Sequence, residues 1–124
     1  MRKRALVVED EGIAENLKSY MEGFGYKSRI MKNGAEALDY LKGADKSEKP
    51  DVILLDRTMP EMDGYEFLRN VESDPEIIDG AKIILTGSFE RQKLSGLNLN
   101  YRIVDKGILL VTYTKRADFK RLLE

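Results

Sequence analysis

Short apolar runs and amphipathic segments alternate along the chain, and this pattern predicts five strands separated by helices. The runs at 52–55 and 82–86 carry apolar residues at consecutive positions, which is typical of strands covered on both faces. The segments between the runs place apolar residues three or four positions apart, as in a helix with one buried face. We expect strands at 4–10, 27–31, 52–56, 82–86 and 101–106, and helices at about 13–24, 34–41, 64–71, 90–97 and 114–123.

Single residues between these segments support the predicted boundaries. Gly25 can stop the first helix, while Asn33 and Asp63 can cap the second and third helices. A regular alternation of strand and helix predicts an α/β fold with a doubly wound parallel sheet. Such sheets bind ligands beyond the carboxyl ends of their strands, near the point where the strand order reverses.

Polar side chains stand at the carboxyl ends of four of the five predicted strands. Glu9 and Asp10 end the first, Asp56 the third, Thr86 the fourth and Lys106 the fifth. Three carboxylates brought together repel one another, and a hard cation that prefers oxygen ligands, such as Mg²⁺, relieves this repulsion. The ammonium and hydroxyl groups can hold the oxygens of an anion. Together the residues predict a phosphoryl-transfer site in which Asp56 is the nucleophile.

Taken singly, each of these residues has an ordinary structural explanation. An acidic pair after a strand is often a solvated turn, and an aspartate there can be a turn former or a helix cap. Thr86 alone is a strand former, and Lys106 alone is an exposed turn residue. The combination favours a functional site, because a purely structural interpretation needs a separate explanation at each of the four strand ends.

Composition narrows the functional classes further. The chain has 124 residues, 42% hydrophobic and 35% charged, which suits one folded domain. A net charge of −1 gives no general attraction to nucleic acid or to a membrane surface. The chain contains no cysteine and no histidine, so it cannot form a disulfide, a thiolate zinc site or a phosphohistidine. No apolar segment is long enough for a membrane span or a signal peptide, so we expect a cytoplasmic protein.

The motifs "VVED", "VILLDRTMPEMDGYEF" and "IILTGS" give the chain a family resemblance. From about Arg4 to the C-terminus it resembles the receiver domain of bacterial two-component response regulators. The resemblance implies a single receiver domain over residues 1–124. It also implies a flavodoxin-like, three-layer α/β/α fold, with a five-stranded parallel sheet in the order 2-1-3-4-5.

The resemblance also implies a role for each candidate site residue. Asp56 matches the phosphoacceptor, Asp10 a direct Mg²⁺ ligand and Glu9 a ligand acting through water. The backbone carbonyl of Thr58 matches the third protein ligand. Thr86 matches the hydroxyl that swings toward the phosphoryl group.

Lys106 matches the lysine that pairs with a phosphoryl oxygen, and Gly87 leaves space beside Thr86.

The implied partners are a sensor histidine kinase or a histidine phosphotransfer protein, and an unidentified downstream protein, with no direct contact to nucleic acid. Such a domain catalyses only its own phosphorylation and dephosphorylation.

The chain departs from the family pattern at several positions. Glu9 replaces the commoner aspartate, Gly107 replaces the proline that usually follows the lysine, and Ile103 stands where an aromatic residue is common. Tyr101 lies two residues earlier, on the same strand face. The β-branched stretch 107–113 can be an irregular start to a short helix from about Thr114, which we favour, or the second strand of a hairpin.

Three other functions stay open at this point. The chain can be a receiver-like binding module that is never phosphorylated, or a Mg²⁺-dependent phosphohydrolase with an aspartate nucleophile. Against the phosphohydrolase, Thr58 replaces a second acid and the length leaves no room for a cap domain. The third alternative is a flavodoxin-like scaffold that binds FMN. Against it, the acidic pair Glu9–Asp10 follows the first strand, where a phosphate-binding loop would be needed. The chain can be a stand-alone receiver or a piece of a larger regulator.

Overall fold

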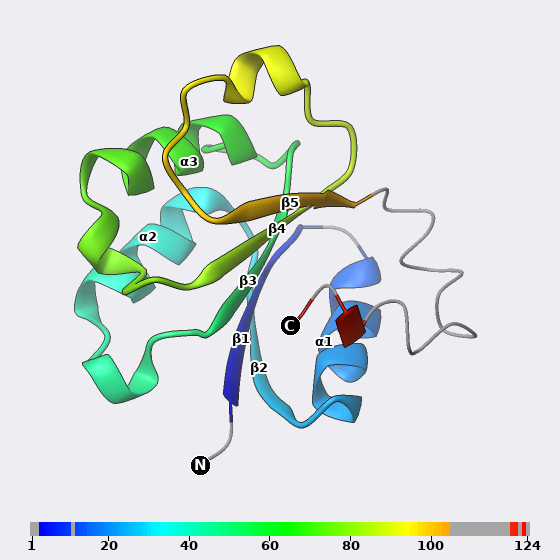
Figure 1. Cartoon of the computed structure of the whole chain (residues 1–124). Helices are drawn as coiled ribbons and strands as arrows, with labels where there is room; N and C mark the ends of the chain where they lie inside the picture. The colour runs from blue at the N-terminus through cyan, green and yellow to red at the C-terminus, as the bar shows by residue number, and fades with distance from the viewer. Residues whose placement is uncertain (1–2, 11, 105–119, 122, 124) are drawn as a thin grey trace.

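A parallel sheet of five strands forms the centre of the molecule, with helices on both faces (Figure 1). The computed structural model describes residues 3–10, 12–104, 120, 121 and 123. The sheet has the order β2-β1-β3-β4-β5, which confirms the predicted flavodoxin-like topology. The strands are β1 (Lys3–Val8), β2 (Tyr26–Met31), β3 (Val52–Asp56), β4 (Lys82–Thr86) and β5 (Tyr101–Val104). The helices between them are α1 (Ile13–Gly23), α2 (Gly34–Gly43) and α3 (Gly64–Ser73), with 3₁₀ turns η1 (Lys46–Glu48), η2 (Pro75–Ile77) and η3 (Arg91–Leu94).

Helices α2 and α3 begin where local chemistry predicts. Asn33 accepts a hydrogen bond on Oδ1 from the amide of Glu36 at 2.9 Å, at the start of α2. Asp63 accepts the equivalent bond from the amide of Glu66 at 2.9 Å, at the start of α3. Both bonds satisfy amides that have no partner within the helix, so the two predicted caps are confirmed.

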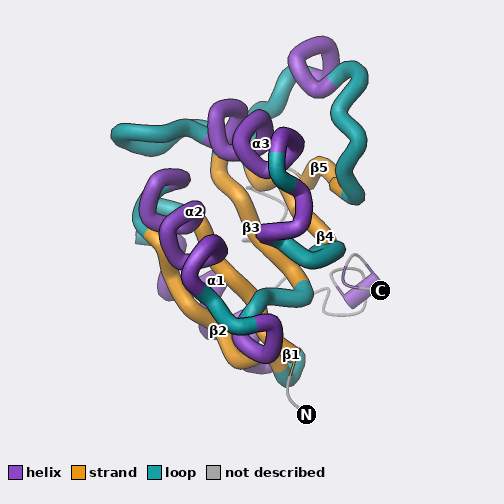
Figure 2. The backbone as a smooth tube through the Cα atoms, turned by 90° about the vertical axis from the view of Figure 1, so that its left-hand side faces the viewer, coloured by secondary structure: helices purple, strands orange, loops and turns teal. Residues whose placement is uncertain are grey.

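Two apolar cores lie on opposite faces of the sheet, because successive side chains of a strand point to opposite sides. All five residues of β3 are buried: the four apolar residues 52–55, as their continuous run predicts, and Asp56 after them. Ile53 and Leu55 pack in the core under α2 and α3, whereas Val52 and Leu54 pack in the core under α1. Figure 2, seen from the side of α2 and α3, shows these helices in front of the strands. The central strands are therefore rigid elements that fix the position of whatever stands at their ends.

The segment between β4 and β5 differs from its prediction. The expected helix over 90–97 is reduced to the single 3₁₀ turn η3. Within that turn only Leu94 is buried, so the segment lacks a second turn of apolar residues to bury against the sheet. Gly96 then adopts a positive φ of 80°, which ends any helical continuation.

Some predicted features lie outside the described residues. Lys106, Gly107 and the stretch 107–113, whether hairpin or irregular helix start, all fall within 105–119. The predicted start of the last helix at Thr114 lies in the same range. Across the described part of the chain, every helix is too short or too polar to cross a membrane.

Candidate functional site

The carboxyl ends of β1, β3 and β4 bring the predicted site residues together at one edge of the sheet. The register pairs Val8 with Leu55, so Glu9 and Asp56 follow side by side. The next pair, Asp56 and Thr86, is in register between β3 and β4. The backbone amide of Glu9 donates to the carbonyl of Met31 at 2.9 Å, which fixes the residue against β2. Parallel pairing thus places residues from three distant parts of the sequence next to one another.

Three carboxylates form a compact acidic cluster at this edge. One carboxylate oxygen each from Glu9, Asp10 and Asp56 lies within 4.8 Å of the others. Glu9 is 1% exposed and Asp56 is 5% exposed, while Asp10 faces solvent. Negative charges this close, two of them out of bulk water, repel strongly unless a cation stands among them. An all-oxygen donor set in a chain without histidine or cysteine fits Mg²⁺.

Thr86 lies beside this cluster but its hydroxyl is directed elsewhere. The side chain is 1% exposed, and its Oγ1 donates to the backbone carbonyl of Leu55 at 3.3 Å. At that length the hydrogen bond is weak, and a stronger acceptor nearby can compete for the hydroxyl. The arrangement suits a group that moves when an anion arrives next to Asp56.

Two glycines allow the backbone to approach Asp56 closely. A Cβ atom at Gly64 would lie 2.5 Å from the carbonyl oxygen of Asp56, a distance that no side chain tolerates. Gly87, with φ of 108°, would place a Cβ 3.5 Å from Oδ1 of Asp56. Gly64 lets the start of α3 approach the backbone of Asp56, and Gly87 keeps the space beside the carboxylate open. The space beside Thr86 that the sequence predicted at Gly87 therefore lies next to Asp56 as well.

The predicted site residues divide into those that the structure brings together and those that it leaves undecided. Glu9, Asp10, Asp56 and Thr86 meet at the sheet edge. Thr58 lies two residues after β3 with an exposed side chain, and the role of its carbonyl as a metal ligand stays a prediction. Lys106 lies outside the described residues, so its role also stays a prediction.

Sequence reasoning missed two residues near the site. Tyr65 was placed only within the predicted helix over 64–71, and Phe89 only in the segment before the helix predicted over 90–97. In the structure the two rings pack edge to face, and they join the start of α3 to the loop after β4. The only sequence signal is the aromatic residue three positions after Thr86, which does not by itself indicate a partner.

Comparison with known proteins identifies relatives of this arrangement. The model of the response regulator receiver domain matches residues 5–106. Response regulator MprA of Mycolicibacterium vanbaalenii is 36% identical over 74 residues, which are 59% of this chain and 30% of the relative. The chain thus matches less than a third of the length of that relative.

Two solved structures share the fold over nearly the whole chain. The phosphorylated cyanobacterial phytochrome response regulator RcpA has a TM-score of 0.76 at 21% identity, covering 99% of this chain and 94% of its own. The receiver domain of sensor histidine kinase PA1611 from Pseudomonas aeruginosa also has a TM-score of 0.76, at 22% identity over 99% of this chain and 95% of its own. The latter holds a magnesium ion in its active site cleft.

Proposed function

The chain belongs to the response regulator receiver domain family, and we propose that Asp56 is the residue on which it carries a phosphoryl group. The acidic cluster is the observation that supports this most directly. It places Asp56 at a sheet edge, within 4.8 Å of two further carboxylates, where a metal and a phosphoryl group can meet. The receiver RcpA, which has the same fold, is itself phosphorylated.

Glu9, Asp10 and Asp56, with the backbone carbonyl of Thr58, are the groups that would hold Mg²⁺. The solvent exposure of Asp10 suits direct contact with an incoming hydrated ion, while the buried Glu9 suits a contact through water. A bound Mg²⁺ offsets the charge of the carboxylates and of the phosphoryl oxygens. The related receiver domain of PA1611 supports this assignment, because it coordinates magnesium in its active site cleft.

The chemistry of transfer uses the Asp56 carboxylate as nucleophile. One carboxylate oxygen attacks the phosphorus of a phosphohistidine, the phosphorus–nitrogen bond breaks, and the electron pair stays on the imidazole nitrogen. The product is an acyl phosphate on Asp56. In the hydrolysis that removes the phosphoryl group, water attacks the phosphorus, the phosphorus–oxygen bond to Asp56 breaks, and the carboxylate leaves with the bonding pair. The inorganic phosphate that forms keeps the protons of the water. The small residue Gly87 beside Oδ1 leaves space for both approaches.

Two donors complete the proposed site. The Thr86 hydroxyl would exchange the Leu55 carbonyl for a phosphoryl oxygen, which carries more negative charge and accepts a stronger hydrogen bond. Lys106 would pair with another phosphoryl oxygen through its ammonium group. The protonated ammonium of Lys106 cannot ligate a cation, and both groups offer donors to an anion, so both would serve the phosphorylated protein. Lys106→Ala should therefore keep Mg²⁺ binding and slow phosphorylation.

Receiver domains of response regulators interact with sensor histidine kinases, and we propose such a kinase or a histidine phosphotransfer protein as the donor here. The output goes to a downstream protein rather than directly to nucleic acid, as the near-zero net charge favours. The chain would act in the cytoplasm as one receiver domain over 1–124. It would promote only its own phosphorylation and dephosphorylation, without turnover of other substrates.

The decisive experiment is intact-mass spectrometry after treatment with acetyl phosphate and Mg²⁺. One added phosphoryl group is expected in the unaltered chain and in Asp39→Asn, a control that removes an exposed carboxylate on α2. Asp56→Asn and samples without Mg²⁺ should gain none. Equal labelling of Asp56→Asn would refute the assignment. Continued release of phosphate from small phosphate esters would favour the phosphohydrolase instead.

A further inference from the structure

The strand β2 stands at one end of the sheet, and no strand pairs with its outer edge within the part of the chain that the structure describes (Figure 1). In a parallel pair, the amide and carbonyl of one residue point to the neighbouring strand, and those of the next residue point away. The Met31 carbonyl accepts the Glu9 amide at 2.9 Å, so Met31 and, by alternation, Arg29 face β1. The backbone groups of Ser28 and Ile30 therefore point away from the sheet, as at any free edge.

A groove of about 310 Å³ is lined by residues 27–30 of this edge strand, and cations dominate its charge. The rest of its lining comes from β1, from the flanking helices α1 and α2, and from the segment before β3. The charged lining residues are four cations and two carboxylates: Arg4, Lys18, Lys27, Arg29, Glu15 and Glu48. The groove thus carries an excess of positive charge, although the whole chain has a net charge of −1.

Arg29 is held in place at the wall of this groove. Its guanidinium carbon lies 5.0 Å from the centroid of the Tyr40 ring on α2. The Tyr40 hydroxyl donates to the carbonyl of Glu48 at 2.9 Å, which fixes the ring in turn. Lys27 points to the same face of the sheet as Arg29, because side chains of a strand alternate, and it lies about 7 Å away along β2. A ligand that follows β2 would meet two cations spaced two residues apart.

The charge of this edge decides between possible occupants. A second copy of the chain, paired through the middle of β2, would bring Lys27 and Arg29 opposite the same cations, and like charges directly opposite are destabilising. A nucleic acid would meet the cations but has no peptide groups to pair with the backbone of Ser28 and Ile30. An acidic peptide strand matches both features, because its carboxylates can face the cations while its backbone bonds to the free edge.

We propose that the edge of β2 binds an acidic segment of a partner protein in extended conformation, which adds a strand beside β2. The carboxylates of that segment would stand at alternate positions, opposite Lys27 and Arg29. None of the residues that line the groove belongs to the acidic cluster at the carboxyl ends of the strands. The inference therefore goes beyond phosphoryl transfer and uses other residues of the chain.

Amide exchange measured by NMR on the full chain tests the proposal, with a peptide of about six residues in which glutamate and threonine alternate. At about ten times its Kd, the peptide should slow exchange of the Ser28 and Ile30 amides about ten-fold, because both gain a hydrogen bond. The amide of Arg29 already faces β1 and should change little. A peptide with the same composition but its glutamates in one block should bind more weakly.

Three results of this experiment would overturn the proposal. The first is that the alternating peptide does not bind. The second is that the two peptides bind equally, which would show attraction to charge without strand pairing. The third is that the alternating peptide binds while exchange at Ser28 and Ile30 stays unchanged.

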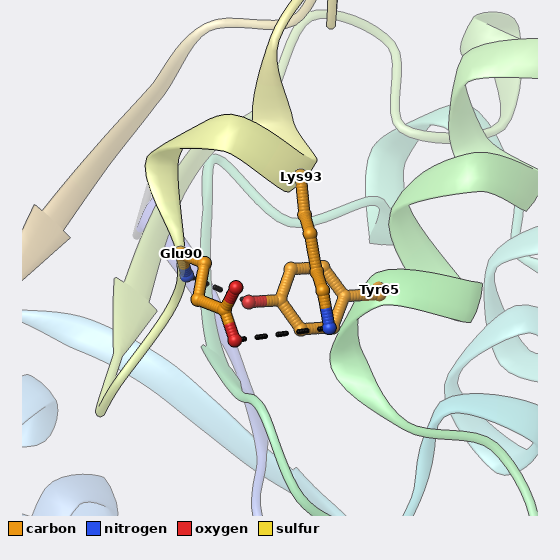
Figure 3. A network of polar contacts seen from close by, with 3 residues as sticks. All are labelled: Tyr65, Glu90 and Lys93. Carbon is orange, nitrogen blue, oxygen red and sulfur yellow. Dashed lines mark hydrogen bonds and ion pairs between the residues drawn. The ribbon is translucent and has the colours of Figure 1, made fainter.

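Charge reversal locates the binding surface. Lys27→Glu and Arg29→Glu should each weaken binding of the alternating peptide about three- to ten-fold, because an attraction becomes a repulsion. Lys93→Glu is the matched control, since Lys93 is an exposed lysine on η3, next to Glu90 and the Tyr65 ring (Figure 3). The turn η3 lies between β4 and β5, at the other end of the sheet from β2, so the control should bind as the unaltered chain does. Equal loss of binding in all three variants would overturn the proposal.

Two further measurements test the other occupants. A thymidine oligonucleotide should bind more weakly than the alternating peptide and leave exchange at Ser28 and Ile30 unchanged. Tighter binding of the oligonucleotide would assign the groove to nucleic acid and overturn the proposal. Without peptide, raising the protein concentration should not slow exchange at these two amides. Slower exchange, with a dimer in sedimentation, would assign the edge to a second copy and overturn the proposal.

Discussion

The hydroxyl of Thr86 donates a hydrogen bond to the carbonyl of Leu55 at 3.3 Å, one residue before the proposed phosphoacceptor. If this hydroxyl turns to the phosphoryl group, Thr86→Ala should still be phosphorylated at Asp56, but it should bind the phosphoryl mimic beryllium fluoride less tightly in the presence of Mg²⁺, because one donor is lost. The variant should also lose about 1 kcal/mol of unfolding free energy, because a buried hydrogen bond is removed. Intact mass, beryllium fluoride binding and urea unfolding measure the three effects.

Thr86→Ser is the control for that prediction, since it keeps the hydroxyl and removes only a methyl group. It should bind beryllium fluoride as the unaltered chain does. If Thr86→Ala binds as tightly as Thr86→Ser, the hydroxyl does not donate to the phosphoryl group.

Mg²⁺ should stabilise the fold by relieving repulsion among Glu9, Asp10 and Asp56. Binding to the native state alone adds about 2.7 kcal/mol when the ion is at a hundred times its Kd. The melting temperature should therefore rise with Mg²⁺ in the unaltered chain and in Asp39→Asn. Asp10→Asn should show a much smaller rise and, without metal, equal or greater stability than the unaltered chain. A full Mg²⁺ response in Asp10→Asn would remove Asp10 from the site.

Gly64→Ala should damage both stability and the site. The new Cβ would lie 2.5 Å from the Asp56 carbonyl and 2.8 Å from Phe89, so the backbone has to shift at a cost of about 1–3 kcal/mol. Gly43→Ala is the matched control, because a Cβ at Gly43 meets no heavy atom within 4 Å. It should be neutral, or more stable by up to about 1 kcal/mol. Denaturant unfolding compares the two, and equal stability of both variants would contradict the close approach at Gly64.

Because Tyr26 is buried, we expect the free energy of unfolding to fall at alkaline pH. Burial raises the pKa of its hydroxyl above the ordinary 10.0, and the nearby Asp51 carboxylate raises this pKa further. Above about pH 10 the unfolded chain releases this proton while the folded chain retains it, so the free energy of unfolding falls as pH rises. The stability that the protonated Tyr26 hydroxyl contributes is fully present below the unfolded pKa, and it is lost as the pH rises through the raised folded pKa.

Tyr26→Phe cannot ionise, so its free energy of unfolding should decline less steeply between pH 9 and about pH 11. Asp51→Asn should make this decline less steep by a smaller amount, because desolvation raises the pKa of Tyr26 more than the Asp51 charge does. Urea unfolding across this pH range measures both slopes, and identical slopes for the unaltered chain and Tyr26→Phe would contradict the assignment.

The order of elements and the acidic site followed from the sequence because their causes are local or repeated. Continuous apolar runs such as 52–55 require cover on both faces, and Asn33 and Asp63 cap helices through bonds to residues three positions away. The predicted helix over 90–97 was wrong in length, since apolar spacing alone cannot show how much of the core remains to be covered.

By itself the sequence determined the alternation of strand and helix, and the convergence of Glu9, Asp10, Asp56 and Thr86 at one edge. Parallel strands leave no other place for residues at their carboxyl ends. The tertiary structure alone decided that the Thr86 hydroxyl faces Leu55, and that Phe89 meets Tyr65 across Gly64. These contacts join loops distant in sequence, and their distances follow from how α3 and the segment after β4 pack, which no local pattern encodes.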